Sequence, residues 1–187
     1  MNLPPITPRK IHIIGGPGSG KTTLAHQLAD RLGAPCVELD RVGYEGGAGA
    51  ERPLAVRLAE VAGLAAGPAW VSEGIFLGWT GALFSAADCI LWLDLPWRVA
   101  AWRIVLRHVK AELRGNNPHT GWRKLYRFLG WCRGYYDPAA PLQPVDPGVD
   151  IAENRVTTEF YLRQFQIKVL RCRRPAEVAA LRQRICP

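Results

Sequence analysis

Apolar residues cluster in five short runs, each about the length of a buried strand. Polar or glycine positions follow these runs, and longer stretches of helical periodicity separate them. The run at 89–96 is apolar without alternation, a pattern typical of a strand covered on both faces of a parallel sheet. We expect strands at residues 10–14, 34–39, 69–72, 89–96 and 166–171.

Between these runs, apolar residues recur at the three- and four-residue spacing of a helix. In the first such stretch the spacing ends at Gly33, which is placed to stop the helix. At 97–113 the spacing predicts a packed side formed by Val99, Trp102, Val105, Leu106 and Val109. We expect helices at 22–32, 52–66, 97–113, 157–164 and 175–185, a short helix near 122–131, and a short helix or turn-rich connection at 77–87.

Strands and helices therefore alternate along the chain. The alternation predicts an α/β fold, with a five-stranded parallel sheet that carries helices on both faces. Ligands of such sheets bind at the carboxyl ends of the strands. Four polar residues end or follow predicted strands at that edge, and we expect them to lie near one site: Asp40, Glu73, Asp94 and Arg171.

One motif stands between the first predicted strand and the first predicted helix. It reads Gly15-Gly16-Pro17-Gly18-Ser19-Gly20-Lys21-Thr22, followed by Thr23, and matches the phosphate-binding P-loop. Its glycines let backbone N–H groups surround a phosphate, and the helix N-terminus adds partial positive charge. Lys21 can reach the β- and γ-phosphates, and the Thr22 hydroxyl can ligate Mg²⁺. The motif predicts nucleotide binding; a glycine-rich turn that binds nothing is the alternative.

Composition narrows the class of protein. The 187 residues fit a single domain, and 24 Lys and Arg against 16 Asp and Glu give a net charge of +8, which suits an anionic partner. Residues 98–133 carry nine basic residues and one acid, although a solvated basic face would look the same. The five cysteines include no Cys-x-x-Cys pair, which argues against a zinc site or a disulfide framework. With no apolar run of membrane-spanning length and no signal-peptide core, we expect a cytoplasmic protein without a membrane partner.

Residues 115–155 differ from the rest of the chain. They are rich in Gly, Pro, Asn, Trp and Tyr, and four prolines stand close together in their second half. Long irregular excursions in compact domains are often lids or binding loops. We therefore expect this lid-like segment to close over bound nucleotide; permanent packing on the core, or a partner surface, is the competing view.

Several stretches together resemble the nucleoside monophosphate kinase group of P-loop kinases, and more closely a bacterial subgroup labelled adenylate kinase-like or DNA topology modulation protein FlaR-related. The resemblance covers nearly the whole chain outside 115–155. It is carried by residues 11–25, 38–40, 70–76, 91–96, 102–107 and 169–174. It implies a P-loop kinase fold and ATP with Mg²⁺ as cofactors.

The same resemblance implies roles for individual residues. Arg103 and Arg107 match the paired arginines of the helix before the lid, one near the adenine and one on the transferring phosphate; a surface pair is the alternative. Glu73 matches the acid that holds the Mg²⁺ hydration shell, with Asp94 as its rival. Asp40 falls where relatives hold the acceptor or assist its hydroxyl, unless it is a plain strand-end acid. Arg173 and Arg174 match a loop beside the adenine.

Two functions follow from these observations. The leading one is an ATP-dependent phosphotransferase for a small-molecule or nucleotide acceptor that offers a hydroxyl or a phosphate. The alternative is a nucleotide-dependent DNA-binding or regulatory P-loop ATPase, because residues 122–131 interleave basic and aromatic side chains as single-strand binders can. A GTPase switch is disfavoured, since no Asn-Lys-x-Asp sequence occurs. Gly74-Ile75-Phe76-Leu77 replaces the Gly-Phe-Pro-Arg of adenylate kinases, which argues against AMP as the acceptor. The sequence indicates no oligomeric state.

Overall fold

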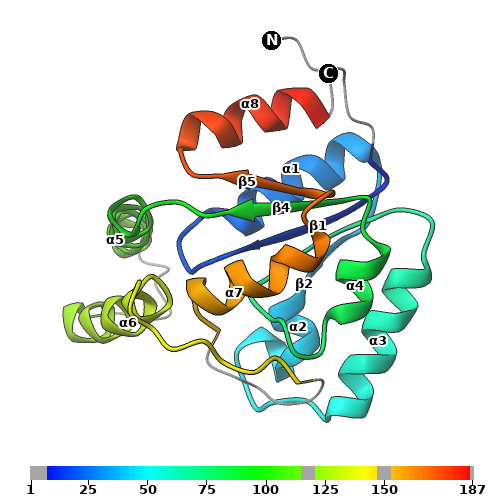
Figure 1. Cartoon of the computed structure of the whole chain (residues 1–187). Coiled ribbons are helices and arrows are strands. Elements are labelled where there is room, and N and C mark those ends of the chain that lie inside the picture. The colour runs from blue at the N-terminus through cyan, green and yellow to red at the C-terminus, as the bar shows by residue number, and fades with distance from the viewer. Residues whose placement is uncertain (1–7, 115–120, 147–152, 186–187) are drawn as a thin grey trace.

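A computed structural model describes residues 8–114, 121–146 and 153–185 (Figure 1). Five parallel strands form one sheet in the order β2-β3-β1-β4-β5, which confirms the predicted α/β class and strand number. The strands are β1 (Lys10–Gly15), β2 (Cys36–Glu38), β3 (Trp70–Gly74), β4 (Cys89–Leu93) and β5 (Val169–Cys172).

Eight α-helices and two short 3₁₀ turns connect and extend the strands in the described residues. They are α1 (Lys21–Leu32), α2 (Leu39–Gly43), η1 (Glu45–Gly47), α3 (Leu54–Ala66), α4 (Gly81–Ala86), α5 (Trp97–Leu113), α6 (Trp122–Tyr135), α7 (Arg155–Leu162), η2 (Arg163–Phe165) and α8 (Pro175–Ile185). None of these helices has the length and apolar character needed to cross a bilayer.

Helices cover both faces of the sheet, as the sequence predicts (Figure 1). Alternation along the central strand decides which core each side chain enters: Ile11 and Ile13 pack with α1 and α8. On the other face, Ile14 packs in a core that also includes residues of α3, α4 and α7. Helices α5 and α6 lie beyond the carboxyl ends of the strands.

The register of the sheet brings the predicted site residues to one edge. Ile13 pairs with Glu73 and Gly15 pairs with Leu93, so the P-loop leaves β1 between the ends of β3 and β4. Glu73 therefore lies beside the loop although 51 residues separate it from Thr22.

Three sequence predictions need correction. Asp40 does not follow a strand directly, because Leu39 turns into the core and starts the short helix α2. The fifth strand begins at Val169 rather than 166, because η2 and a turn from Phe165 to Lys168 occupy the preceding residues.

The third correction concerns the packed side of α5. Its buried residues are Ala100, Ile104 and His108, whereas Trp102 and Leu106, which were predicted to pack, are exposed. Helix α5 packs on the P-loop and on α6 instead of lying flat on the sheet, so only a narrow stripe is covered.

The lid-like segment is described only in part, and residues 115–120 and 147–152 lie outside the described residues. Helix α6 continues to Tyr135, four residues beyond the predicted end, and is followed by an irregular stretch up to 146. Leu125, Cys132 and Tyr135 of α6 are buried. In this structure α6 packs against α5 and the P-loop.

Candidate functional site

The P-loop runs from the end of β1 to the start of α1 and needs glycine at two positions. Gly18 and Gly20 have φ angles of +77° and +94°, which other residues rarely adopt. A Cβ atom on Gly18 would lie 2.7 Å from the carbonyl oxygen of Ala100. Glycine thus permits both the turn of the loop and its close approach to α5.

Side chains of α5 and the end of α6 hold the outside of the loop. Arg103 Nη1 donates to the Ser19 carbonyl at 2.6 Å, and the Tyr136 hydroxyl donates to the Pro17 carbonyl at 2.8 Å. These carbonyl oxygens face protein donors rather than the space where a phosphate would bind. The contacts therefore favour a loop conformation suited to an anion.

Lys21 lies at the first turn of α1, and its Nζ donates to the Gly16 carbonyl at 3.3 Å. Burial lowers the pKa of Lys21, and the nearby carboxylates of Glu73 and Asp40 oppose that shift. A bound phosphate would stabilise the ammonium form in the same way. The surroundings of Lys21 thus suit an anionic ligand.

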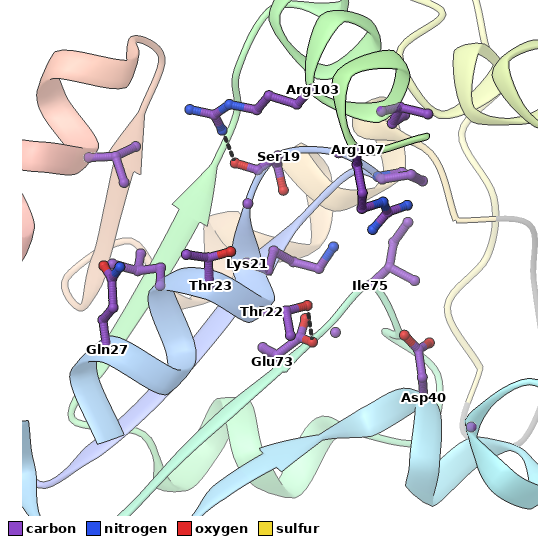
Figure 2. Close-up of a pocket in the computed structure, with 18 of the residues that line it drawn as sticks. Ser19, Lys21, Thr22, Thr23, Gln27, Asp40, Glu73, Ile75, Arg103 and Arg107 are labelled. Atoms are coloured by element: carbon purple, nitrogen blue, oxygen red, sulfur yellow. Dashed lines mark hydrogen bonds between the residues drawn. The ribbon is translucent and has the colours of Figure 1, made fainter. Parts of the chain in front are cut away.

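Thr22 and Glu73 form a direct contact at the loop (Figure 2). The Thr22 hydroxyl donates to Glu73 Oε1 at 2.7 Å, and Glu73 is only 3% exposed. Burial raises the pKa of Glu73, while the Lys21 charge and the Thr22 hydrogen bond oppose the rise.

This pair fits Mg²⁺, which takes hard oxygen ligands and often uses one or two carboxylates together with substrate phosphates and water. No cluster of three or more His, Cys, Asp or Glu suited to a metal occurs among the described residues. A protein contribution of one hydroxyl and one carboxylate agrees with an ion held mainly by its nucleotide.

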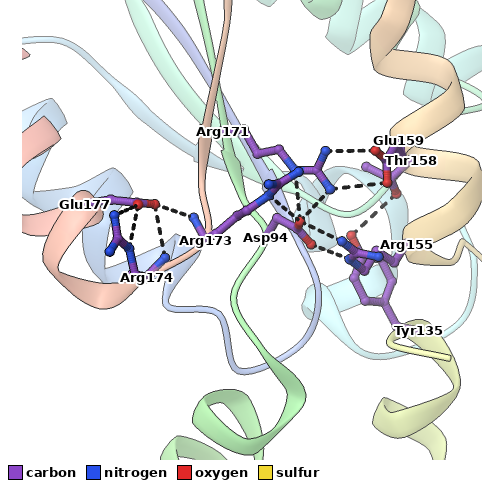
Figure 3. Close-up of polar contacts among 9 residues, drawn as sticks. All are labelled: Asp94, Tyr135, Arg155, Thr158, Glu159, Arg171, Arg173, Arg174 and Glu177. Carbon is purple, nitrogen blue, oxygen red and sulfur yellow. Dashed lines mark hydrogen bonds and ion pairs between the residues drawn. The ribbon is translucent and has the colours of Figure 1, made fainter. Parts of the chain in front are cut away.

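Asp94, the rival acid, is engaged elsewhere (Figure 3). Arg155 donates to both of its carboxylate oxygens, at 2.6 and 3.0 Å, and Arg171 Nε donates to Oδ2 at 2.9 Å. Arg171 also pairs with Glu159 at 2.8 Å. The network joins the end of β4 to α7 and β5, which favours a structural role for Asp94 and Arg171.

Arg173 and Arg174 lie at the start of α8 and do not line the cavity described below. Both backbone N–H groups donate to Glu177 Oε2, and Arg174 Nε donates to Glu177 Oε1 at 2.7 Å. These contacts cap the helix. Adenine contact by either arginine stays a prediction.

Arg103 and Arg107 lie one turn apart on α5, but their guanidinium groups diverge (Figure 2). Arg103 reaches back to Ser19, whereas Arg107 points into the cavity on the side of Ile75. The positive charge of Arg107 acts to lower the pKa of Lys21. The two arginines therefore have different surroundings: Arg103 supports the loop, and Arg107 faces the space next to Lys21.

All these elements border one cavity of about 980 Å³, which is within the range of small-molecule sites. We call its two extremities the α8 end and the α2 end, on either side of Lys21. The α8 end is lined by Thr23, Gln27, Pro175, Val178, Ala179 and Arg182. The α2 end is lined by Asp40, Tyr44, Gly47, Ala48, Gly49 and Ile75, and Phe128 and Trp131 of α6 also line the cavity.

The sequence predicts that Asp40, Glu73, Lys21 and Thr22 belong to the site, and all four line this cavity. Much of the remaining lining is not predicted. Phe128 and Trp131 stand three residues apart on α6, a spacing that places both on one helix face. That spacing was a usable signal. No local sequence signal marks Gln27 or Arg182 as part of the wall. Arg182 Nη1 donates to Gln27 Oε1 at 3.0 Å, a contact that joins α1 to α8 across 155 residues.

The parallel sheet, the loop after β1 and the polar residues at the strand ends together define a P-loop NTPase fold. A family model described as an AAA domain matches residues 10–44, which span β1 to the start of the segment after α2. No curated protein matches the chain.

Three solved structures are similar over most of their length. They are shikimate kinase from Acinetobacter baumannii in complex with shikimate (14% identity, 95% of this chain and 90% of that chain, TM-score 0.47), a sugar kinase from Janibacter sp. (21%, 94% and 91%, 0.46) and a gluconokinase from Sinorhizobium meliloti (16%, 97% and 95%, 0.47). At these TM-scores the similarities do not support a functional assignment. The nucleic-acid alternative gains no support from any comparison.

Proposed function

We propose that the protein is an ATP-dependent phosphotransferase of the P-loop kinase type that acts on a small-molecule hydroxyl acceptor. The observation that carries the proposal is the shape of the cavity. It extends beyond Lys21 to Asp40, so it offers space for a second substrate next to the phosphates. A nucleotide switch or simple ATPase needs no such space.

The residues divide into binding and transfer roles. Backbone N–H groups of the loop and the N-terminus of α1 bind the β- and γ-phosphates, with Lys21 as the side-chain cation. Arg107 stabilises the charge that develops on the transferred phosphoryl group. Thr22 and Glu73 hold Mg²⁺, which supplies charge compensation to the phosphates when bound.

Asp40 accepts the proton of the acceptor hydroxyl. Its carboxylate is exposed to the cavity, and partial burial together with Glu38 raises its pKa against the opposing charge of Lys21. A raised pKa makes a carboxylate a better base, provided that it lies within hydrogen-bond reach of the hydroxyl.

The test is acceptor-dependent formation of ADP, with the phosphorylated product identified by mass spectrometry. Lys21→Ala should lower turnover roughly 10²- to 10³-fold, as expected for loss of one preorganised charge donor. Lys110→Ala is the matched control, because Lys110 is exposed on α5 and does not line the cavity.

Two outcomes would reject the proposal in different ways. Equal turnover in Lys21→Ala and wild type would reject the P-loop as the site of transfer. The protein could instead bind ATP tightly and hydrolyse it at a rate that no acceptor changes, without transfer to any acceptor. That result would reject the phosphotransferase and leave an ATPase.

A further inference from the structure

The α8 end of the cavity is a slot between two helices. Thr23 and Gln27 stand four residues apart on α1, so both face the slot from one side of that helix. Val178 and Arg182 have the same spacing on α8 and line the slot from the other side. Figure 2 shows Thr23 and Gln27 on one side of Lys21, so the slot leads away from the place where the phosphates would bind.

A contact between side chains closes the far end of this slot. Arg182 Nη1 donates to Gln27 Oε1 at 3.0 Å. One turn further along α1, Arg31 Nη1 donates to the carbonyl oxygen of Arg182 at 3.2 Å. The two bonds hold α8 beside α1. They also fix the orientation of the Gln27 carboxamide, because its NH₂ group and the guanidinium are both donors and cannot face each other.

This orientation leaves Gln27 Nε2 as an unused donor on the cavity wall. The oxygen of the carboxamide is occupied by Arg182, and no described residue accepts a hydrogen bond from the nitrogen. A ligand atom that accepts at this point therefore gains a hydrogen bond for which no protein group competes.

The sides of the slot are apolar. Pro175, Val178 and Ala179 line it from α8, and Leu24 lines it from α1. Apolar walls with a few polar groups that fix orientation are typical of sites for small ligands with flat rings. Adenine has apolar ring faces, and its ring nitrogens accept hydrogen bonds at the edge. The slot thus suits the base of a nucleotide whose phosphates lie on the P-loop.

Arg173 and Arg174, which the resemblance to P-loop kinases places beside the adenine, have different surroundings. Their side chains are 65% and 77% exposed, and Arg174 pairs with Glu177. Neither arginine lines the cavity. The contacts at this end of the site therefore favour residues of the slot for recognition of the base.

We propose that Gln27 recognises the adenine of the nucleotide through Nε2, which donates to a ring nitrogen of the base. Arg182 is a positioning residue, which acts by holding the Gln27 carboxamide in the orientation that presents this donor. The inference rests on the proposed function for the identity of the nucleotide. It moves recognition of the base from the start of α8 to the contact between α1 and α8.

Calorimetric titration with ADP and its deaza analogues tests the hydrogen bond. Each analogue replaces one ring nitrogen, N1, N3 or N7, by a C–H group that cannot accept. One of the three should bind the wild-type protein at least fivefold more weakly than ADP, because Gln27 Nε2 then loses its acceptor. ADP is used because it is the product of transfer, and inorganic pyrophosphate, which has no base, reports the phosphate contacts alone.

Two substitutions of Gln27 separate recognition of the base from folding. Gln27→Ala removes the donor, whereas Gln27→Glu keeps an acceptor for Arg182 and so keeps the contact between the helices, but its carboxylate cannot donate. In both variants the preference for ADP over the weaker analogue should disappear, as expected when one partner of a coupled pair is removed. Gln27→Ala should leave pyrophosphate binding unchanged. Gln183→Ala, exposed on α8 and outside the lining, is the control that should keep the preference.

Arg182→Ala tests the positioning role. The Gln27 carboxamide is then free to turn, so the preference for ADP over the weaker analogue should fall by at least half while pyrophosphate binding stays unchanged. An equal loss of ADP and pyrophosphate binding would assign Arg182 to the phosphates and overturn its positioning role.

Equal affinity of the wild-type protein for ADP and all three analogues would overturn the inference. A preference that persists in both Gln27 variants would overturn it as well, since another group would then recognise the ring nitrogen. In either case Lys21-dependent phosphoryl transfer would leave the proposed function standing. Absence of Lys21-dependent transfer, together with a preference that depends on Gln27, would reject the proposed function and keep the contact with the base.

Discussion

Acidification should weaken the fold through His12, which lies in β1 directly before the P-loop. His12 is fully buried, its Nδ1 shares a hydrogen bond of 2.9 Å with Ser72 Oγ, and its ring meets Phe84 edge-on at 4.5 Å. Burial lowers its pKa from 6.5 to about 3. The folded protein therefore holds a neutral imidazole where the unfolded chain would take up a proton.

The sign and size of the effect follow from linkage. Because the folded pKa is depressed, the stabilisation is complete above the unfolded value of 6.5 and is lost as the pH falls toward 3. At pH 5, about 1.5 units below the unfolded pKa, His12 should account for a loss of about 2 kcal/mol. Since Ser72 precedes Glu73, the loss falls on the two strands that carry the site.

Urea unfolding at pH 7, 6 and 5 measures this loss. His12→Asn keeps a polar atom near Ser72 but cannot take up a proton, so its free energy of unfolding should fall by about 2 kcal/mol less than that of the wild type between pH 7 and pH 5. His26→Asn is the control, because His26 is exposed and pairs with Glu38. Parallel pH profiles for wild type and His12→Asn would refute the reasoning.

Three further predictions follow from the site. Glu73→Gln should raise the Mg²⁺ concentration needed for turnover, whereas Asp94→Asn should leave it unchanged and lower stability by about 3 kcal/mol, because the charge that pairs with Arg155 and with Arg171 is lost from a buried position and only Arg171 keeps a second carboxylate, Glu159; a magnesium titration and thermal unfolding of both variants separate the roles. If the lid-like segment closes on nucleotide, its amides gain hydrogen-exchange protection with an ATP analogue and Arg107→Ala lowers transfer more than nucleotide affinity; exchange that is already slow and unchanged by nucleotide would rule out a closing lid. Gly18→Ala should abolish nucleotide binding, since its Cβ would meet α5. Gly130→Ala, on open helix surface, should raise stability by roughly 0.5–1 kcal/mol in thermal unfolding. Equal effects of the two substitutions on nucleotide binding and on stability would contradict the geometry.

Local sequence patterns are sufficient to predict most of the helices and strands of the fold. The helices at 97–113 and 175–185 were predicted with the bounds that the structure has, because their periodicity and flanking residues agree. The P-loop was predictable because its motif fixes both the turn and its neighbours. Asp40 was misplaced because Leu39 suits either a strand end or a helix start, and burial in the tertiary structure decides between them.

The cavity wall was harder to predict because it depends on contacts between distant segments. Hydropathy selected Trp102 and Leu106 as the packed side of α5, but the partners of this helix are the P-loop glycines and α6, which cover Ala100 and Ile104 instead. The contact of Tyr136 with Pro17 joins residues 119 apart and follows from no local pattern.

The order of strands has a consequence for synthesis on the ribosome. The central strand β1 is made first, yet both of its neighbours, β3 and β4, follow some sixty or more residues later. The wall of the α8 end comes later still, since α8 follows β5. A nascent chain thus displays an unpaired or half-paired apolar strand for about the first half of its elongation, a period in which exposed strand edges favour aggregation, and its nucleotide pocket stays unfinished until α8 is made. Pauses in translation or chaperone binding should therefore matter most between the emergence of β1 and that of β4.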